Sequence, residues 1–258
     1  NTQRGTPWNP WDIETHRAPG GSSSGTGVAV AARFAPCGVG TDTGGSVRIP
    51  SAFCGITGLK VTEGALPLEG IEPLSHTLDT PGPMCRSVID AAIMFETMAG
   101  REPHSIDSDL RNIRGLYREI RKGAAGLQLG VLTEADRSIV DPEILTCYDA
   151  ALEKFVSMGA DLKPFTFPRS IDEMRFAVAT IIGVEGYQYH GHLYENSTNS
   201  MDEHVKKRIM AGKLEPSKKY IGLLEERLKD RAAFLDAMQG LSAILTPSVP
   251  SVAPAVND

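Results

Sequence analysis

The chain has 258 residues, of which 41% are hydrophobic and 22% charged, a composition typical of a globular protein with a sizeable core. Its net charge of −6, without any run of five like charges, argues against a nucleic-acid partner or an anionic membrane surface. The four cysteines are widely spaced and form no CxxC pair, so a zinc site is not expected. No apolar run approaches the roughly 20 residues that a membrane span needs. We therefore expect a cytoplasmic protein with reduced cysteines and no membrane association.

The first sixty residues contain two serine-bearing glycine loops. Residues 1–19 predict irregular structure that leads into the first loop. The predicted segments then follow in order: the loop GGSSSG at Gly20–Gly25, a buried helix at Thr26–Phe34, a short buried strand at Cys37–Thr41, the loop DTGGS at Asp42–Ser46, a short helix at Val47–Cys54 and a short strand at Ile56–Lys60. Pro50 fits the first turn of the short helix, where a missing N–H costs nothing.

Ser46 is the candidate nucleophile. Two glycines precede it and a predicted helix begins just after it. Glycine loops turn several N–H groups inward and favour negative charge. The loop amides and the helix end would both stabilise an oxyanion formed next to the serine. The alternative is that the two loops are ordinary flexible turns, which glycine and serine also favour.

The next hundred residues alternate between helices and strands. Ser87–Gly100 predicts a helix because its apolar residues recur at helical spacing, with Ser87 as N-cap and Gly100 as the stop. The other predictions are a loop at Glu63–Pro83, a possible helix at Ser108–Lys122, a strand at Leu127–Leu132, a helix at Asp141–Met158 and a strand at Ala160–Phe167. This alternation predicts an α/β protein with a mainly parallel or mixed sheet covered on both faces.

The last third of the chain is predicted to be mostly helical. The predicted segments are one long helix or two at Ile171–Asn196, helices at Met201–Ala211 and Pro216–Gln239, and a strand at Leu241–Thr246. The final residues are rich in proline and carry no packing signal.

The stretch Gly20–Lys60 resembles the amidase signature family closely, and Pro19 before it also fits. The similarity continues more weakly through LSHTLDTPGPMCRSVIDAA at Leu74–Ala92. The resemblance implies one amidase-signature domain over residues 1–258, with three αβα layers around a mixed central sheet. It also implies an amide hydrolase that needs no cofactor and no metal.

The family uses a serine–serine–lysine triad. By motif position, the resemblance implies that Ser46 is the acylated nucleophile and Ser22 the bridging serine, with a cis peptide bond between Gly21 and Ser22. It further implies an oxyanion hole made by the backbone amides of Thr43, Gly44, Gly45 and Ser46.

The triad lysine is where the chain departs from the family. In the family this lysine lies well upstream of the serine loops, whereas no lysine precedes Ser22 here and the first one is Lys60, in the motif tail. We therefore expect an internal part of a longer enzyme, without the upstream lysine segment and the C-terminal sheet. By itself this part should hydrolyse amides weakly or not at all.

Three residues are expected to support the loops: Ser23, Asp42 and Arg48. Asp42 and Arg48 flank the nucleophile and could bind a polar substrate. The interpretation that we favour is that they brace the loop.

Histidines offer rival sites. His76 and Asp79 could complete a serine–histidine–aspartate triad with Ser46, although such triads are recognised by geometry and not by sequence. His190 and His192 are two residues apart and would not share a helix face, so a metal site there is disfavoured against a pocket or surface role.

Three functions remain open. The first is a stand-alone amidase that releases a carboxylic acid and ammonia or an amine from a small-molecule amide, with a homodimer as a possible assembly. The second is an amidotransferase A-type subunit that acts on glutamine for tRNA amidation. In that subunit glutamine typically follows the GGSxR motif, whereas Ile49 stands here and favours the amidase. The third is a catalytically dead fragment.

Overall fold

The computed structural model describes residues 5–100, 120–196 and 202–256. The chain divides into two compact units, which we describe separately. The first comprises Asn1–Tyr117, Arg175–Leu223 and Ala253–Asp258, and the second comprises Arg118–Met174 and Leu224–Val252. Each unit contains a sheet with helices packed on it, so the predicted α/β class is confirmed. The expectation of a single domain stays a prediction.

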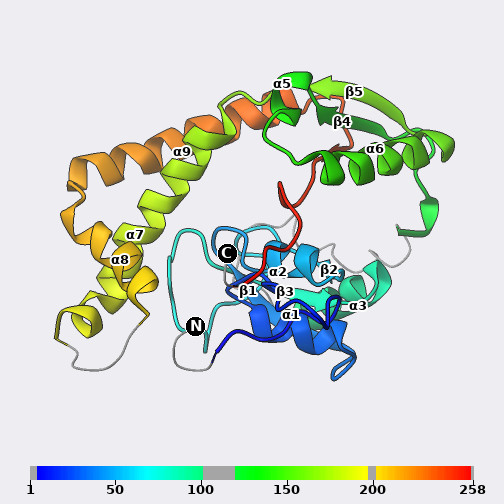
Figure 1. The fold of residues 1–258 in the computed structure, drawn as a ribbon. Coiled ribbons are helices and arrows are strands. Elements are labelled where there is room, and N and C mark those ends of the chain that lie inside the picture. Colours follow the sequence, from blue (N-terminus) through cyan, green and yellow to red (C-terminus); the bar gives the residue numbers. More distant parts are fainter. Residues whose placement is uncertain (1–4, 101–119, 197–201, 257–258) are drawn as a thin grey trace. The chain divides into compact units, whose positions relative to one another are not determined.

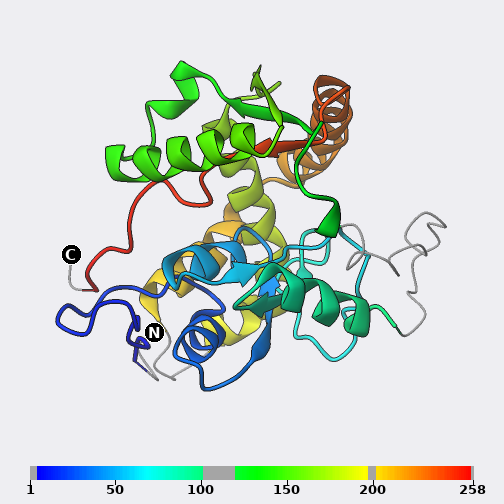
Figure 2. The ribbon, with the colours of Figure 1, turned by 90° about the vertical axis from the view of Figure 1, so that its right-hand side faces the viewer.

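The sheet of the first unit has three antiparallel strands in the order β1-β3-β2. Its elements are β1 (Cys37–Asp42), β2 (Thr57–Gly58), β3 (Thr80–Cys85), α1 (Ser24–Ala31), α2 (Arg48–Phe53) and α3 (Val88–Met98). Figures 1 and 2 show these three helices grouped around the sheet. The middle strand of the sheet is β3, and all six of its residues are buried.

Strand β3 corrects the prediction of a loop at Glu63–Pro83. The sequence TPGPMC argued against a strand because proline cannot donate to a β-ladder. In the antiparallel ladder, however, the N–H and C=O of one residue point to the same side. The Pro83 carbonyl accepts the Leu59 N–H (3.0 Å), so Pro83, and with it Pro81 two residues earlier, face away from β1, beyond the end of β2, which pairs only with Met84 and Cys85. The β1 ladder therefore stays intact. A Cβ at Gly82 would lie 2.2 Å from the Leu59 carbonyl oxygen, so this close approach requires glycine.

The predicted helices of the first unit form with small shifts at their ends. Ser87 caps α3, and its hydroxyl accepts the Asp90 N–H (3.1 Å), as predicted. The helix expected at Thr26–Phe34 begins and ends earlier, because Arg33 takes a positive φ of 66° and stops it. The C-terminal residues also pack here, since the Ala18 N–H donates to the Pro254 carbonyl (2.8 Å).

The second unit contains the parallel sheet that the alternating pattern predicted. Its elements are β4 (Gln128–Leu132), β5 (Asp161–Phe165), β6 (Ala243–Leu245), α5 (Glu134–Arg137), α6 (Pro142–Ser157) and the 3-10 turn η2 (Ile120–Lys122). The central strand β4 pairs in parallel with both β5 and β6, and α6 runs alongside them (Figure 1). Tyr148 of α6 accepts the Leu132 N–H (3.1 Å) and donates to the Leu245 carbonyl (2.8 Å), so one phenol ties the helix to two strands.

Two long helices contribute residues to both units. They are α7 (Ile171–Asn196) and α9 (Ser217–Ala237), and between them lie α8 (Glu203–Ala211) and the 3-10 turn η3 (Gly212–Leu214). The segment predicted as one helix or two is thus a single helix of 26 residues. Most of the helix predicted at Ser108–Lys122 lies outside the described residues. In the described part of the chain, no helix has the length and apolar character of a membrane span.

Candidate active site

The two serine loops lie next to each other at one end of β1. Ser23 joins them, because its N–H donates to the Ser46 carbonyl (3.3 Å). The Ser23 hydroxyl also accepts the Thr41 N–H (3.3 Å) and donates to the Thr41 carbonyl (3.4 Å), at the end of β1. Ser22 is exposed and Ser46 half-buried, so both side chains are accessible from solvent.

The first loop has the backbone that the resemblance implied. The Gly21–Ser22 peptide bond is cis, which confirms that prediction. Gly20 has a φ of +78°, and a Cβ there would lie 2.8 Å from the Cα of Pro50 in α2. Only glycine fits this position, where the first loop crosses the helix that follows Ser46. No hydrogen bond between the Ser22 and Ser46 hydroxyls is found among the described residues, and their direct approach stays a prediction.

Asp42 is the organising residue of the second loop. Its carboxylate is fully buried and accepts the backbone N–H groups of Gly45 (2.7 Å), Val47 (3.1 Å) and Arg48 (3.3 Å). The Arg48 side chain donates to it twice, from Nε (3.0 Å) and Nη2 (2.9 Å). Burial raises the pKa of Asp42, but the hydrogen bonds and charge of Arg48 and the backbone amides hold it below its ordinary value. The two residues therefore pair and brace the loop, the arrangement that the sequence favoured.

The Asp42 contacts divide the four amides that the resemblance assigned to the oxyanion hole. The Gly45 N–H is directed at Asp42. The N–H groups of Thr43, Gly44 and Ser46 have no acceptor among the described residues. Of the four amides, only that of Gly45 is therefore used to hold the turn in shape.

A second buried carboxylate, Asp79, supports the loop from the side. The Thr43 hydroxyl donates to Asp79 Oδ1, and the N–H groups of Leu74 (2.8 Å) and Ser75 (2.9 Å) donate to Oδ2. Thr80, the next residue, donates its hydroxyl to the Asp42 carbonyl (3.0 Å). The weakly family-like segment from Leu74 onward therefore contacts the loop at Asp42–Ser46 directly.

The rival triad is not assembled. Asp79 is occupied by Thr43 and by two backbone amides, and the described residues include no hydrogen bond or ion pair between Asp79 and His76. His76 is about half exposed (54%), and its Nδ1 lies 3.6 Å from Glu185 Oε2. A histidine that acts as base for Ser46 needs a partner that orients its ring toward the serine.

We expect His76→Ala to leave amide hydrolysis within roughly threefold of the unchanged protein, because the imidazole is turned toward Glu185 and not toward an Asp79–Ser46 pair. Steady-state assays with an aryl amide on the full-length protein measure this. A loss of a hundredfold or more would restore the rival triad.

His190 and the four cysteines also lie among the described residues. His190 contacts the Pro73 carbonyl (2.7 Å from Nε2). No cluster of three or more metal-ligating side chains is found among the described residues. All four cysteines are free, and burial raises the pKa of Cys54 and Cys85 to about 11, so both thiols stay protonated near neutral pH.

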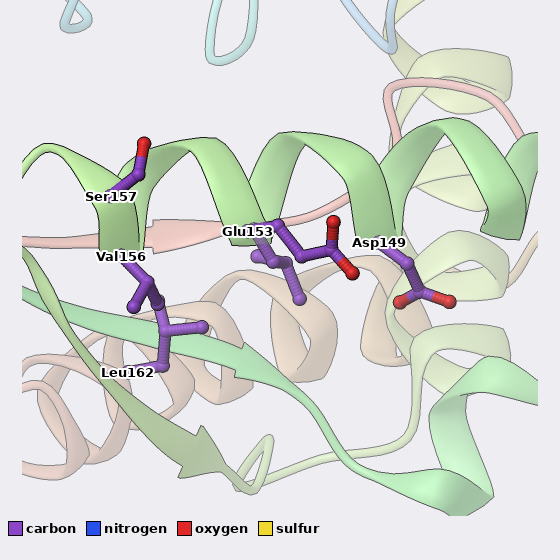
Figure 3. Close-up of a pocket in the computed structure, with 6 residues that line it drawn as sticks. Asp149, Glu153, Val156, Ser157 and Leu162 are labelled. Atoms are coloured by element: carbon purple, nitrogen blue, oxygen red, sulfur yellow. The ribbon is translucent and has the colours of Figure 1, made fainter.

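An open pocket lies in the second unit between α6 and β5. Figure 3 shows Val156 of α6 beside Leu162 of β5, with the carboxylates of Asp149 and Glu153 along the same helix. Asp149 already pairs with Arg137 (2.7 Å). None of the predicted site residues lines this pocket.

Sequence reasoning missed Glu185 and Tyr220. Glu185 is almost completely buried (2% exposed) on α7, and the Tyr220 hydroxyl donates to it (2.7 Å). No motif surrounds either residue, and an isolated glutamate in a helix is normally exposed. Only the fold reveals this buried carboxylate.

Comparisons with known proteins agree with this geometry. The family model described as Amidase matches residues 1–258. The chain therefore belongs to the amidase family, as its serine loops predicted. Over 269 residues it is 33% identical to the A-type subunit of glutamyl-tRNA(Gln) amidotransferase from Chromohalobacter salexigens, and the match covers 95% of this chain and 55% of that protein.

Solved structures give the same result. One belongs to a vestigial protein complex that bears on the origins of an s-triazine catabolic enzyme, with a TM-score of 0.89, 30% identity and coverage of 100% of this chain and 55% of that one. Another is an amidase, with a TM-score of 0.80, 28% identity and coverage of 94% and 52%. The chain thus spans about half the length of the relatives it matches.

Proposed function

We propose that the protein is an amide hydrolase that forms an acyl-enzyme on Ser46. The observation that carries the proposal is the division of the loop amides. Asp42 takes the N–H groups of Gly45, Val47 and Arg48, and the N–H groups beside the Ser46 hydroxyl stay open. A carbonyl oxygen placed on the open amides would present its carbon to Ser46, and the developing negative charge would meet fixed donors.

In the proposed mechanism Ser46 Oγ attacks the amide carbonyl, and its proton passes to Ser22. A lysine, which the family resemblance places N-terminal to the residues of this chain, accepts the proton that Ser22 releases. The tetrahedral intermediate expels ammonia or an amine, which takes up a proton as the C–N bond breaks. Water then hydrolyses the Ser46 ester to a carboxylic acid. Ser23 supports the arrangement by holding the two loops together.

The second candidate is an amidotransferase component that takes ammonia from glutamine. The naming of the Chromohalobacter relative favours it. Ile49 argues against it, because it stands where that type of subunit typically has glutamine. Its side chain lies against the loop, since a Cβ on Gly45 would be 2.7 Å from Ile49 Cδ1. We favour the hydrolase. A homodimer and a cytoplasmic location stay predictions.

We expect the full-length protein to release ammonia from simple primary amides without ATP or tRNA, with a kcat/KM at least roughly tenfold above that for glutamine. Coupled ammonia assays on a panel of aliphatic amides, aryl amides and glutamine measure this. Glutamine hydrolysis that depends on tRNA and a partner protein would favour the amidotransferase. Failure of a fluorophosphonate to label Ser46, with no turnover of any amide, would favour a catalytically dead protein.

A further inference from the structure

Glu185 on α7 is a buried carboxylate that the proposed mechanism does not use. Oε1 accepts the hydroxyls of Thr77 (2.7 Å) and Tyr220 (2.7 Å). Oε2 accepts the Ser75 hydroxyl and the Thr77 N–H (3.2 Å). Three of these four bonds come from one short segment, residues 74–79, so one side chain of α7 is hydrogen-bonded to that segment three times.

The segment 74–79 in turn holds the nucleophile loop. Asp79 lies at its end and accepts the Thr43 hydroxyl, while the same carboxylate accepts the N–H of Ser75. Ser75 therefore takes part in both carboxylate networks, because its hydroxyl goes to Glu185 and its N–H to Asp79. Glu185 is thus connected to Thr43 through Ser75 and Asp79. All four residues belong to the first unit.

Helix α7 also contacts the loop by packing. A Cβ added at Gly44 would lie 3.1 Å from Ile182 Cδ1 and 3.7 Å from Val178 Cγ1, both one to two turns before Glu185 on the same helix. The amides left open at Thr43 and Gly44 are thus bordered by α7 on one side and by the Asp79 segment on the other. Hydrogen-bond donors stabilise an oxyanion best when they are fixed in place before the reaction, because moving them into place during the reaction would cost free energy.

We propose that Glu185 is a positioning residue that fixes the Thr43–Ser46 loop through the segment 74–79. Its catalytic consequence rests on the proposed amidase function. Glu185 itself contacts no reacting atom. It determines where the Thr43 and Gly44 amides point, so its loss should lower kcat more than it alters KM.

Two variants separate this role from a general loss of structure. Thr77→Val keeps the shape of the side chain but removes a hydroxyl that links Glu185 to the segment. Tyr220→Phe removes a hydroxyl from the same Glu185 oxygen but leaves the segment attached. We expect Thr77→Val to act in the same direction as Glu185→Leu, and Tyr220→Phe to have little effect. Glu195→Leu is the control on the same helix, because Glu195 contacts Tyr187 and Lys213 and not the segment.

The first measurement is amide hydrogen exchange at Gly45 and Val47, whose N–H groups donate to Asp42. In the full-length protein, Glu185→Leu should accelerate exchange there by roughly tenfold or more, and leave the amides of β4 unchanged as an internal reference. The second is steady-state kinetics with an aryl amide, where kcat should fall at least roughly tenfold and KM should change less than about threefold.

Unchanged exchange at Gly45 and Val47 in both Glu185→Leu and Thr77→Val would overturn the proposal, as would an equal effect of Tyr220→Phe. If Glu185→Leu does not fold, Thr77→Val decides by the same criteria. If the unchanged protein hydrolyses no amide, the proposed function fails, and the exchange measurement still decides whether Glu185 positions the loop.

Discussion

Replacing Ser46 with alanine in the full-length protein should abolish amide hydrolysis. In the proposed mechanism the Ser46 hydroxyl is the nucleophile, and the other hydroxyl of the loop, on Thr43, donates to Asp79. Removing one member of a unit that acts together typically costs at least about 10³-fold in rate. Ser22→Ala should lower the rate strongly for the same reason, and the two losses should not add. Single-turnover assays with an aryl amide, together with fluorophosphonate labelling, measure both variants.

Ser24→Ala is the matched control for the serine loop. Ser24 belongs to the same loop, but its hydroxyl donates to the Gly20 carbonyl (2.6 Å). This hydrogen bond stabilises the turn at Gly20–Ser24 and has no part in the proposed mechanism. We expect a modest loss of activity and unchanged labelling of Ser46. Robust turnover by Ser46→Ala, or turnover that survives Ser22→Ala but fails in His76→Ala, would contradict the serine–serine–lysine assignment.

Asp42→Asn should lower both stability and activity, although it only replaces one carboxylate oxygen with an NH2 group. All five groups that donate to Asp42 are N–H groups, and none of them can accept a hydrogen bond. An asparagine NH2 would face at least two of these donors whichever way it is turned. We expect a loss of about 2–3 kcal/mol in the free energy of unfolding. The rate of hydrolysis should fall at least about 10²-fold, because the neighbouring amides lose their orientation.

The pH dependence of stability gives Asp42 a separate test. Its pKa is held below the ordinary value of 3.8. Its contribution to stability should therefore be complete above about pH 3.8 and be lost as the pH falls through the lower folded-state pKa. In Asp42→Asn this part of the acid sensitivity should be absent. Urea titrations at a series of acidic pH values measure the difference between the two proteins.

Arg48→Gln is the control for the Asp42 variant. It removes the side-chain pair but keeps the three backbone donors to Asp42. Because the Arg48 side chain is about half exposed (48%), solvent screens the pair and the loss should stay near 0.5–1 kcal/mol. A loss in Arg48→Gln as large as that in Asp42→Asn would show that the ion pair, and not the amide contacts, holds the loop.

Local sequence signals determined most of the secondary structure and the family. Apolar spacing and a serine cap defined α3, and an alternation of strand and helix defined the parallel pairing of β4 with β5. The glycine–serine loops identified Ser22 and Ser46 as candidates. These features depend on neighbours a few residues apart, so the order of residues is enough to predict them.

Only the tertiary structure decided how the loop is held. Strand β3 contains Pro81 and Pro83, which is tolerable because both face away from β1, on the side where β2 pairs only with Met84 and Cys85. The Gly45 amide is taken by Asp42, and Glu185 reaches the loop through a segment about 110 positions away in the chain. Such contacts join residues far apart in sequence, and their energy depends on burial and on which donors meet which acceptors. No local pattern carries that information, because it arises only when the chain is folded.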